Sequence, residues 1–399
     1  MKERRKDMSR EPRLPNGETD AQKVNEYYLR VSKKLRNLKY LMLLLMVAAL
    51  ILTLWAYRSR LTYDNFRYIL RDIDEAGHTS LNSDAVYYTA NDTNVYLYFR
   101  GDLAVCSSGG VSFHRSLGSR SFADDVSFRS PVITGSGKYM IAYDAGGNRF
   151  YVYNSISRVY NETLEHSVID CAAADDGGFA VLTKSDVGDC VVRLYDKNFN
   201  LVGKITRDGY AYSIGFLDDG RLYICESFSS DASLYTDVSL YTVGTDDIDS
   251  TFAVQGIVLD AGSCADGFAV VSTLGVGFYG SDAAKTSYHS FGTSDVLYGS
   301  VTKNGVCVLL DKNEVGAAEE AVICFADGTS NRTSVSYGAK GAVLCGEKAV
   351  VLYDDRLTVC STDESREITI PDGAKKMLLM DEKSVIVCYN DYAKVFEVN

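Results

Sequence analysis

Histidine, tryptophan and proline are scarce in this chain of 399 residues, which contains 4 His, 1 Trp and 4 Pro. The histidines are His78, His114, His166 and His289, and no two of them have the spacing of a metal site or a catalytic triad. No GxSxG segment is present, so the nucleophile elbow of the α/β hydrolases is absent as well. The sequence therefore predicts a protein that is not an enzyme, with no catalytic residue, no cofactor and no metal ligand.

Positive charge is in short supply beyond the first part of the chain. There are 41 Lys+Arg against 53 Asp+Glu, which gives a net charge of −12. Residues 1–39 carry a net charge of +6, whereas the remainder carries −18. An acidic domain repels the phosphates of nucleic acid, so we exclude nucleic acid as a partner.

One hydrophobic run, from Tyr40 to Tyr57, separates the basic arm from the acidic domain. Its 18 residues contain no charge, and as a helix they would cover roughly 27 Å, close to the hydrocarbon thickness of a bilayer. The basic side faces the cytoplasm by the positive-inside rule. A signal peptide is the alternative, but the run is long for a signal core and no small-x-small cleavage site follows it. We predict a single-pass plasma-membrane anchor that contacts the lipid bilayer through residues 40–57, with the C-terminal domain extracytoplasmic.

The segments around this run have their own patterns. Residues 1–18 are polar and are predicted to form a disordered cytoplasmic arm. Residues 19–39 repeat apolar side chains every three or four positions, which predicts an amphipathic cytoplasmic helix continuing into the span. Such a helix lies against lipid headgroups or, alternatively, pairs as a weak homodimer. Residues 58–84 are predicted to form a short juxtamembrane helix and a connector, and residues 85–399 the exported domain.

Short β-rich segments repeat along residues 85–399. Eight apolar runs each follow a turn of Asp, Asn, Gly or Lys, and their starting points lie 36 to 46 residues apart. A period of this length is typical of a propeller or a solenoid. The runs, which we predict to be central strands buried on both faces, begin at Leu103, Tyr139, Phe179, Leu222, Phe268, Val306, Ala349 and Val385.

Eight units of about four strands predict an all-β fold, an eight-bladed β-propeller, or a seven-bladed one if a weak unit is an insertion. Only three strands are visible in the last unit. The segment Ala85 to Ala90 precedes the first unit and can supply the fourth strand beside Tyr392 to Val398. Joining both ends of the domain in one blade would remove the open sheet edges.

The cysteines and the acidic turns are the other candidate sites. Ten cysteines lie beyond the apolar run without a single CxxC, so we expect buried free thiols, with one or two disulfides between blades as the alternative. Calcium is a conceivable ligand of the acidic turns at Asp175-Asp176, Asp218-Asp219 and Asp246-Asp247-Asp249. None of them follows a known calcium loop, and an Asp-Gly turn needs no metal.

The stretch from Pro131 to Ile205, beginning PVITGSGKYMIAYDAGGNRFYVYN, resembles the bacterial family called domain of unknown function 5711. The similarity takes in YLYFRGDLAVCSSGGVSF before it and GFLDDGRLYICE after it, and extends over most of residues 60–399. The resemblance implies a single-pass membrane protein of anaerobic Gram-positive bacteria with an external propeller. It implies no activity and no site residue, because the family has none assigned.

The sequence leaves three classes of function open. The first is a membrane-anchored extracytoplasmic binding or scaffold module whose propeller loops bind an envelope protein or a cell-wall polymer. The alternative is a cell-wall glycan hydrolase or lyase with carboxylates in the propeller funnel. A sensor acting through the cytoplasmic helix is a third class. The absence of any recognisable carboxylate pair favours the binding module.

Overall fold

The computed structural model describes residues 20–56, 85–115, 120–186, 188–244, 248–313, 316–361 and 365–398. The chain divides into two compact units, Met1–Thr79 and Ser80–Asn399. The arm predicted at residues 1–18 and the juxtamembrane helix and connector predicted at 58–84 lie outside the described residues. The first unit is therefore described by its helix and the second by its strands.

The helix α1 runs without interruption from Asp20 to Ala56. It is the only helix in the described ranges that is long and apolar enough to cross a membrane, and the qualifying segment is Val31–Leu52. No part of this segment is buried inside the protein, and Trp55 is 65 % exposed. Exposed apolar side chains on a helix of this length match a bilayer better than water.

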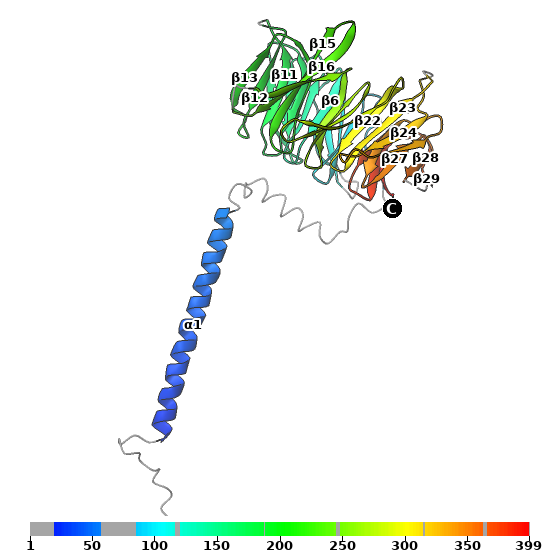
Figure 1. Ribbon diagram of the computed structural model, residues 1–399. Coiled ribbons are helices and arrows are strands. Elements are labelled where there is room, and N and C mark those ends of the chain that lie inside the picture. Colours follow the sequence, from blue (N-terminus) through cyan, green and yellow to red (C-terminus); the bar gives the residue numbers. More distant parts are fainter. Residues whose placement is uncertain are drawn as a thin grey trace, which may run out of the picture. The chain divides into compact units, whose positions relative to one another are not determined.

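The second unit consists of four-stranded antiparallel sheets, the blades of a β-propeller (Figure 1). Blade 1 contains β2 (Val95–Phe99), β3 (Asp102–Ser107), β4 (Gly110–His114) and β5 (Arg120–Asp124). Blade 2 contains β6 (Pro131–Gly135), β7 (Met140–Asp144), β8 (Arg149–Tyr153) and β9 (Arg158–Thr163). Blade 3 contains β10 (Val168–Ala173), β11 (Phe179–Lys184), β12 (Cys190–Tyr195) and β13 (Leu201–Arg207). Blade 4 contains β14 (Tyr210–Phe216), β15 (Arg221–Ser230), β16 (Ser233–Thr242) and β17 (Ile248–Gln255).

The remaining sheets repeat this order. Blade 5 contains β18 (Val258–Cys264), β19 (Gly267–Ser272), β20 (Gly275–Gly280) and β21 (Lys285–Ser290). Blade 6 contains β22 (Asp295–Thr302), β23 (Gly305–Asp311), β24 (Glu320–Cys324) and β25 (Ser330–Ser334). Blade 7 contains β26 (Gly341–Cys345), β27 (Lys348–Leu352), β28 (Arg356–Cys360) and β29 (Ser365–Thr369). The closing blade contains β30 (Lys376–Leu379), β31 (Ser384–Cys388), β32 (Tyr392–Glu397) and β1 (Val86–Tyr87).

The closing blade joins the two ends of the domain. Its strand order is β1-β32-β31-β30, with Val86 opposite Ala393 and Tyr87 opposite Tyr392. The predicted closure by the first and last segments is therefore confirmed, and the propeller has eight blades rather than seven. The pairing is shorter than predicted, because only two residues of the segment Ala85 to Ala90 form a strand.

The first strands of the blades surround the propeller axis. Each contacts the first strand of the next blade, from β2 through β6, β10, β14, β18, β22, β26 and β30 and back to β2. Since the circle is unbroken, these eight strands form the wall of the central channel.

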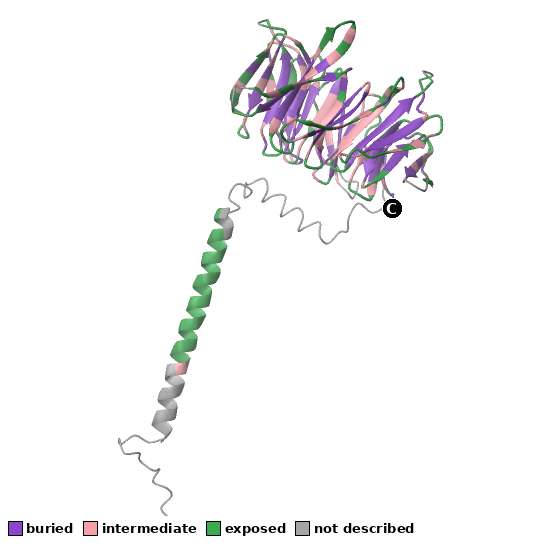
Figure 2. Cartoon of the chain, in the orientation of Figure 1, coloured by how far each residue is buried: buried purple, intermediate pink, exposed green. Residues whose placement is uncertain are grey.

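The hydrophobic core lies between the blades rather than at the centre. Eight clusters of buried side chains each fill the gap between two consecutive blades, and they appear purple in Figure 2. The predicted central strands supply more of these side chains than the first, third or outer strands do, and β7, β19 and β23 are buried over most of their length. Between the closing blade and blade 1 the cluster holds 8 buried residues, the fewest of the eight clusters.

Two carboxylates join first strands of neighbouring blades by hydrogen bonds. Asp170 of β10 accepts the backbone N–H of Ile214 in β14 at 3.0 Å, and Asp260 of β18 accepts that of Val301 in β22 at 3.0 Å. Each aspartate follows a β-bulge that turns its side chain away from the regular ladder. Burial raises the pKa of Asp260 to about 6. These carboxylates brace the ring around the channel.

All ten cysteines are buried and unpaired, in agreement with the prediction of free thiols. Burial raises the pKa of Cys106 and Cys225 to about 12 and that of Cys264 to about 11. Since the thiolate is the reactive form, these thiols are chemically inert in the folded protein.

Candidate functional site

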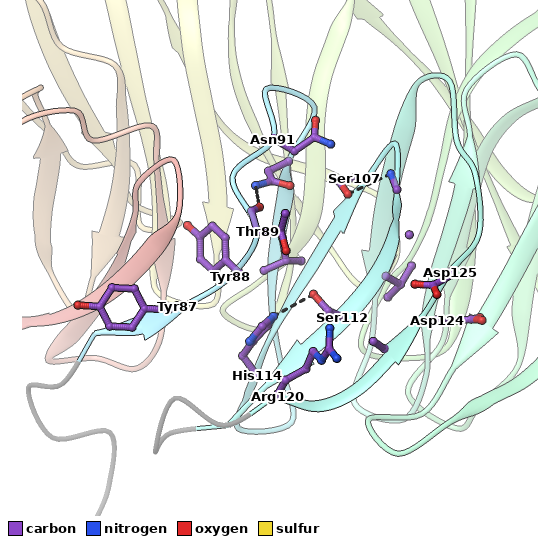
Figure 3. A pocket seen from close by; sticks show the side chains of 16 residues that line it. Tyr87, Tyr88, Thr89, Asn91, Ser107, Ser112, His114, Arg120, Asp124 and Asp125 are labelled. Carbon is purple, nitrogen blue, oxygen red and sulfur yellow. Dashed lines mark hydrogen bonds between the residues drawn. The ribbon is translucent and has the colours of Figure 1, made fainter.

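A pocket lies at the interface between the closing blade and blade 1, which we call the seam. It has a volume of about 410 Å³, within the range of roughly 300–1,000 Å³ common for ligand pockets. Figure 3 shows side chains from β1, from the loop after it and from β3, β4 and β5 around one hollow. The seam pocket is lined by Tyr87, Tyr88, Thr89, Asn91, Asn94, Val105, Ser107, Gly109, Gly110, Val111, Ser112, His114, Arg120, Ala123, Asp124 and Asp125.

The pocket exists because the outer strand of the closing blade is short. β1 has 2 residues, whereas the outer strands of the other seven blades have 5 to 8. The outer half of blade 1 therefore faces a gap where another blade would present a full strand. Gly110 sits at the start of β4 with φ +137, and a Cβ there would overlap the carbonyl oxygen of Asp124. Only glycine allows β4 and β5 to approach in this way.

Ser112 and His114 form a hydrogen-bonded pair in this pocket. They are two residues apart on β4, so their side chains lie on the same face of the sheet. Ser112 Oγ and His114 Nε2 are 2.9 Å apart, and His114 is 4 % exposed. Burial, aided by the positive charge of Arg120, lowers the pKa of His114 to about 4. The imidazole is therefore neutral at pH 7.

Two buried polar atoms in the pocket wall have no hydrogen-bond partner among the described residues. They are Nδ1 of His114 and Oδ1 of Asn94. Buried polar atoms in native proteins usually bond to protein, water or ligand. The amide of Asn94 is otherwise engaged, since its Nδ2 donates to the carbonyl of Thr89 at 3.1 Å. The pocket wall thus offers hydrogen-bonding capacity that the described part of the protein does not use.

The loops at the pocket rim are tied to one another. Asn91 Oδ1 accepts the backbone N–H of Thr93 at 2.9 Å, and its Nδ2 donates to Ser108 Oγ at 3.0 Å. Ser108 N–H in turn donates to Thr93 Oγ1 at 2.8 Å. The loop after β1 and the turn between β3 and β4 are therefore held in one arrangement, which lowers the entropy cost of binding.

Tyr88 closes the inner end of the pocket. Its hydroxyl lies 2.8 Å from the carbonyl oxygen of Tyr389 and 2.7 Å from that of Tyr392, so it can donate to either. Its ring packs against Tyr96 at 5.5 Å and against the edge of His114 at 6.0 Å. Burial raises the pKa of Tyr88, so the hydroxyl stays protonated.

The charged groups of the pocket lie along β5 and its end. Asp124 accepts the hydroxyl of Tyr153 at 2.9 Å and pairs with Arg158 of blade 2 at 3.3 Å. Arg120 and Asp125 are exposed and of opposite sign. When Arg158 is counted with these residues, the positive and negative charges around the pocket balance.

Because His114 is buried, we expect the free energy of unfolding to fall as the solution is made acidic. The free histidine titrates near 6.5 and the folded one near 4, so the unfolded chain binds the extra proton between these values. The stabilisation is complete above pH 6.5 and is lost as the pH falls toward 4. We expect His114→Gln to remove about 1–2 kcal/mol of this pH dependence, after a discount for solvent in the pocket. Denaturant unfolding of both proteins between pH 7 and pH 4 measures it, and parallel curves would contradict the prediction.

The structure does not bring the other histidines together. His166 lies 3.6 Å from Asp186, while His289 lies on β21 of another blade and His78 lies outside the described residues. No group of three His, Cys, Asp or Glu side chains in the described ranges could hold a metal ion.

The aspartates of the acidic turns bind backbone N–H groups and nearby side chains. Asp175 accepts the N–H of Gly137 in the neighbouring blade at 2.7 Å, and Asp219 accepts that of Arg221 at 3.0 Å. Asp218 pairs with Lys303 at 3.0 Å. Asp246 and Asp247 lie outside the described residues, and Asp249 accepts the hydroxyl of Thr242.

Sequence reasoning did not find the seam pocket. The serine and histidine of the segment GVSFHR are two positions apart, so the period of a strand places them on one face. What the sequence did not reveal was the gap opposite that face, which depends on the length of β1.

One protein-family model matches part of the chain. Residues 79–256 match the model of a family described as "Family of unknown function (DUF5711)". This part of the chain is similar to DUF5711. The DUF5711 match contains β1 and blades 1 to 4, and therefore every residue that lines the seam pocket.

Solved structures share the propeller fold. The Dos1 propeller has a TM-score of 0.55 and 10 % identity, covering 79 % of this chain and 95 % of that chain. The C-terminal WD40 domain of Sif2 has a TM-score of 0.54 and 10 % identity, covering 80 % of this chain and 98 % of that chain. BamB from Moraxella catarrhalis has a TM-score of 0.47 and 11 % identity, covering 79 % of this chain and 100 % of that chain. No curated protein matches the chain. Identities this low show the fold alone.

Proposed function

We propose that this protein is a membrane-anchored, extracytoplasmic binding module whose propeller holds a component of the cell envelope, a protein or a wall polymer. The observation that carries the proposal is the seam pocket, a preformed hollow with unused hydrogen-bonding groups in its wall. A rigid scaffold that positions loops around such a hollow is the usual setting of a binding site.

The anchor part of the proposal rests on α1 and on charge. The exposed apolar surface of Val31–Leu52 needs a nonpolar solvent. The net charge of +6 in residues 1–39 favours a cytoplasmic N-terminus, which places the acidic propeller on the other side.

A glycan hydrolase receives less support. The first strands around the channel contain three carboxylates, Asp170, Asp260 and Asp295. Two of them, Asp170 and Asp260, accept backbone N–H groups of the next blade and so act in bracing the ring. Ser112 and His114 have the spacing of a nucleophile and a base, but no described carboxylate orients Nδ1 of the histidine.

Cysteine labelling tests on which side of the membrane the propeller lies. Background labelling should be low, because all ten natural thiols are buried. Ser229 is exposed in β15, and Ser9 lies in the N-terminal arm. We expect a membrane-impermeant maleimide to label Ser229→Cys in intact cells, and to label the matched variant Ser9→Cys only after permeabilisation. The reverse pattern would overturn the extracytoplasmic assignment.

Binding is tested separately with the full chain in detergent, by co-sedimentation with isolated cell walls and with envelope membranes prepared from cells that lack the protein. Retention in either pellet supports a binding module. Absence from both pellets, combined with release of soluble sugar from the walls, would favour the hydrolase instead.

A further inference from the structure

The inner wall of the seam pocket is polar but uncharged. Its groups are the amide of Asn94, the hydroxyls of Ser107 and Ser112, and a histidine that stays neutral at pH 7. The amide and hydroxyls can each donate and accept hydrogen bonds. A partner that suits this wall presents several neutral groups with the same dual capacity, which is the chemistry of sugar hydroxyls.

The charges of the pocket do not call for an ionic ligand. Asp124 is already paired with Arg158 at 3.3 Å. Exposed Arg120 begins β5 and exposed Asp125 follows its end, and the two have opposite signs, so the pocket presents no cluster of like charges to a phosphate or a cation. A neutral ligand needs no such cluster.

An aromatic ring stands at the rim. Tyr87 is 66 % exposed, although it is adjacent to the buried Tyr88, and its ring lies 6.0 Å from that of Tyr392 (Figure 3 shows Tyr87 on β1). Tyrosine offers an apolar face and a polar tip in one rigid group. The C–H face of a sugar ring packs on such a surface while its hydroxyls reach the polar wall.

We infer that the seam pocket binds an uncharged saccharide unit of an envelope glycan. The inference rests on the proposed function, since it names the ligand class of that binding module. The fixed rim loops, held by Asn91 and Thr93, keep the pocket shaped in the absence of sugar. The volume of about 410 Å³ limits the bound part to one or two sugar rings.

The test is titration calorimetry of the full chain in detergent with a panel of uncharged oligosaccharides: chitotetraose, cellotetraose, mannotetraose and reduced wall-glycan strands freed of peptide. A short acidic peptide and inorganic phosphate serve as probes of the other ligand classes. We expect saturable binding of at least one saccharide. The double variant Tyr87→Ala/Ser112→Ala should weaken it about tenfold or more, because an aromatic contact and a hydrogen bond are lost.

The matched control is Tyr210→Ala, which removes another tyrosine of similar exposure, 60 %, from blade 4. It should bind like the unmodified protein, and near-ultraviolet circular dichroism checks that each variant is folded. No saccharide binding, equal binding by the double variant, or binding of only the peptide or phosphate would overturn the inference. If the protein still sediments with envelopes in that case, the proposed function stands and the saccharide assignment alone fails. Competition by wall-glycan strands or by glycopeptides identifies the source of the sugar.

Discussion

Removing the carboxylate of Asp170 is expected to destabilise the propeller by about 3 kcal/mol or more. The side chain connects three blades: Oδ1 accepts the hydroxyl of Tyr143 in blade 2 at 2.8 Å, and Oδ2 accepts the N–H of Ile214 in blade 4. The N–H of Cys171 donates to Oδ1 as well, at 2.8 Å. In Asp170→Ala these donors would lose their acceptor in a partly buried setting, each at a cost of about 1–3 kcal/mol.

The variant Asp170→Asn distinguishes the contribution of the negative charge to stability from that of the hydrogen bonds. Burial raises the pKa of Asp170, so the protein gains little from its negative charge. The amide oxygen retains an acceptor, and we expect a loss of less than half that of the alanine variant. The shift of the denaturation midpoint of the full chain in urea measures both. An alanine variant within about 0.5 kcal/mol of the unmodified protein would show that the bridge is dispensable.

Tyr88→Ala should be comparably damaging, at about 3–5 kcal/mol, because it removes a buried ring from the smallest of the core clusters. It also removes the hydroxyl that reaches the carbonyls of Tyr389 and Tyr392. Only two residue pairs join β1 to β32, so the contacts of Tyr88 supply much of the free energy that joins the two ends of the domain. We expect a lower unfolding midpoint and concentration-dependent association, since an opened seam exposes strand edges.

Two further variants show which part of Tyr88 accounts for the loss of stability. Tyr88→Phe keeps the ring and should lose only about 1–2 kcal/mol for the hydrogen bond. Tyr87→Ala removes an exposed ring at the adjacent position and should change stability by about 0.5 kcal/mol or less. Equal losses of unfolding free energy in Tyr87→Ala and Tyr88→Ala would mean that the buried contacts of Tyr88 do not stabilise the closing blade.

The regular part of the fold was predictable from the sequence. The apolar runs beginning at Phe179 and Val306 are buried central strands, because a strand between two blades must be apolar on both faces. The number of blades was left at seven or eight, since spacings between 36 and 46 residues do not distinguish an insertion from a long hairpin. In blade 4 the extra length is the hairpin of β15 and β16, with 10 residues in each strand.

The polar details were less accessible. Asp170 and Asp260 occupy the same place in two similar segments, VIDCAA and VLDAGSC, so a repeated aspartate in a first strand was a usable signal. The seam pocket had no such signal. It forms between the first and last parts of the domain, and its shape depends on β1 ending after two residues, which strand propensity does not determine.

The pairing of β1 with β32 also fixes the order in which the molecule can be completed. Tyr88 and Tyr389 are 301 positions apart, so their contact forms only after residue 389 has been synthesised. Until then β1 has no partner strand, and the incomplete propeller ends in strands with unpaired edges. A chain stalled before residue 392 therefore lacks the last partner of β1, and a quality-control protease can recognise the unfinished product by its exposed edge.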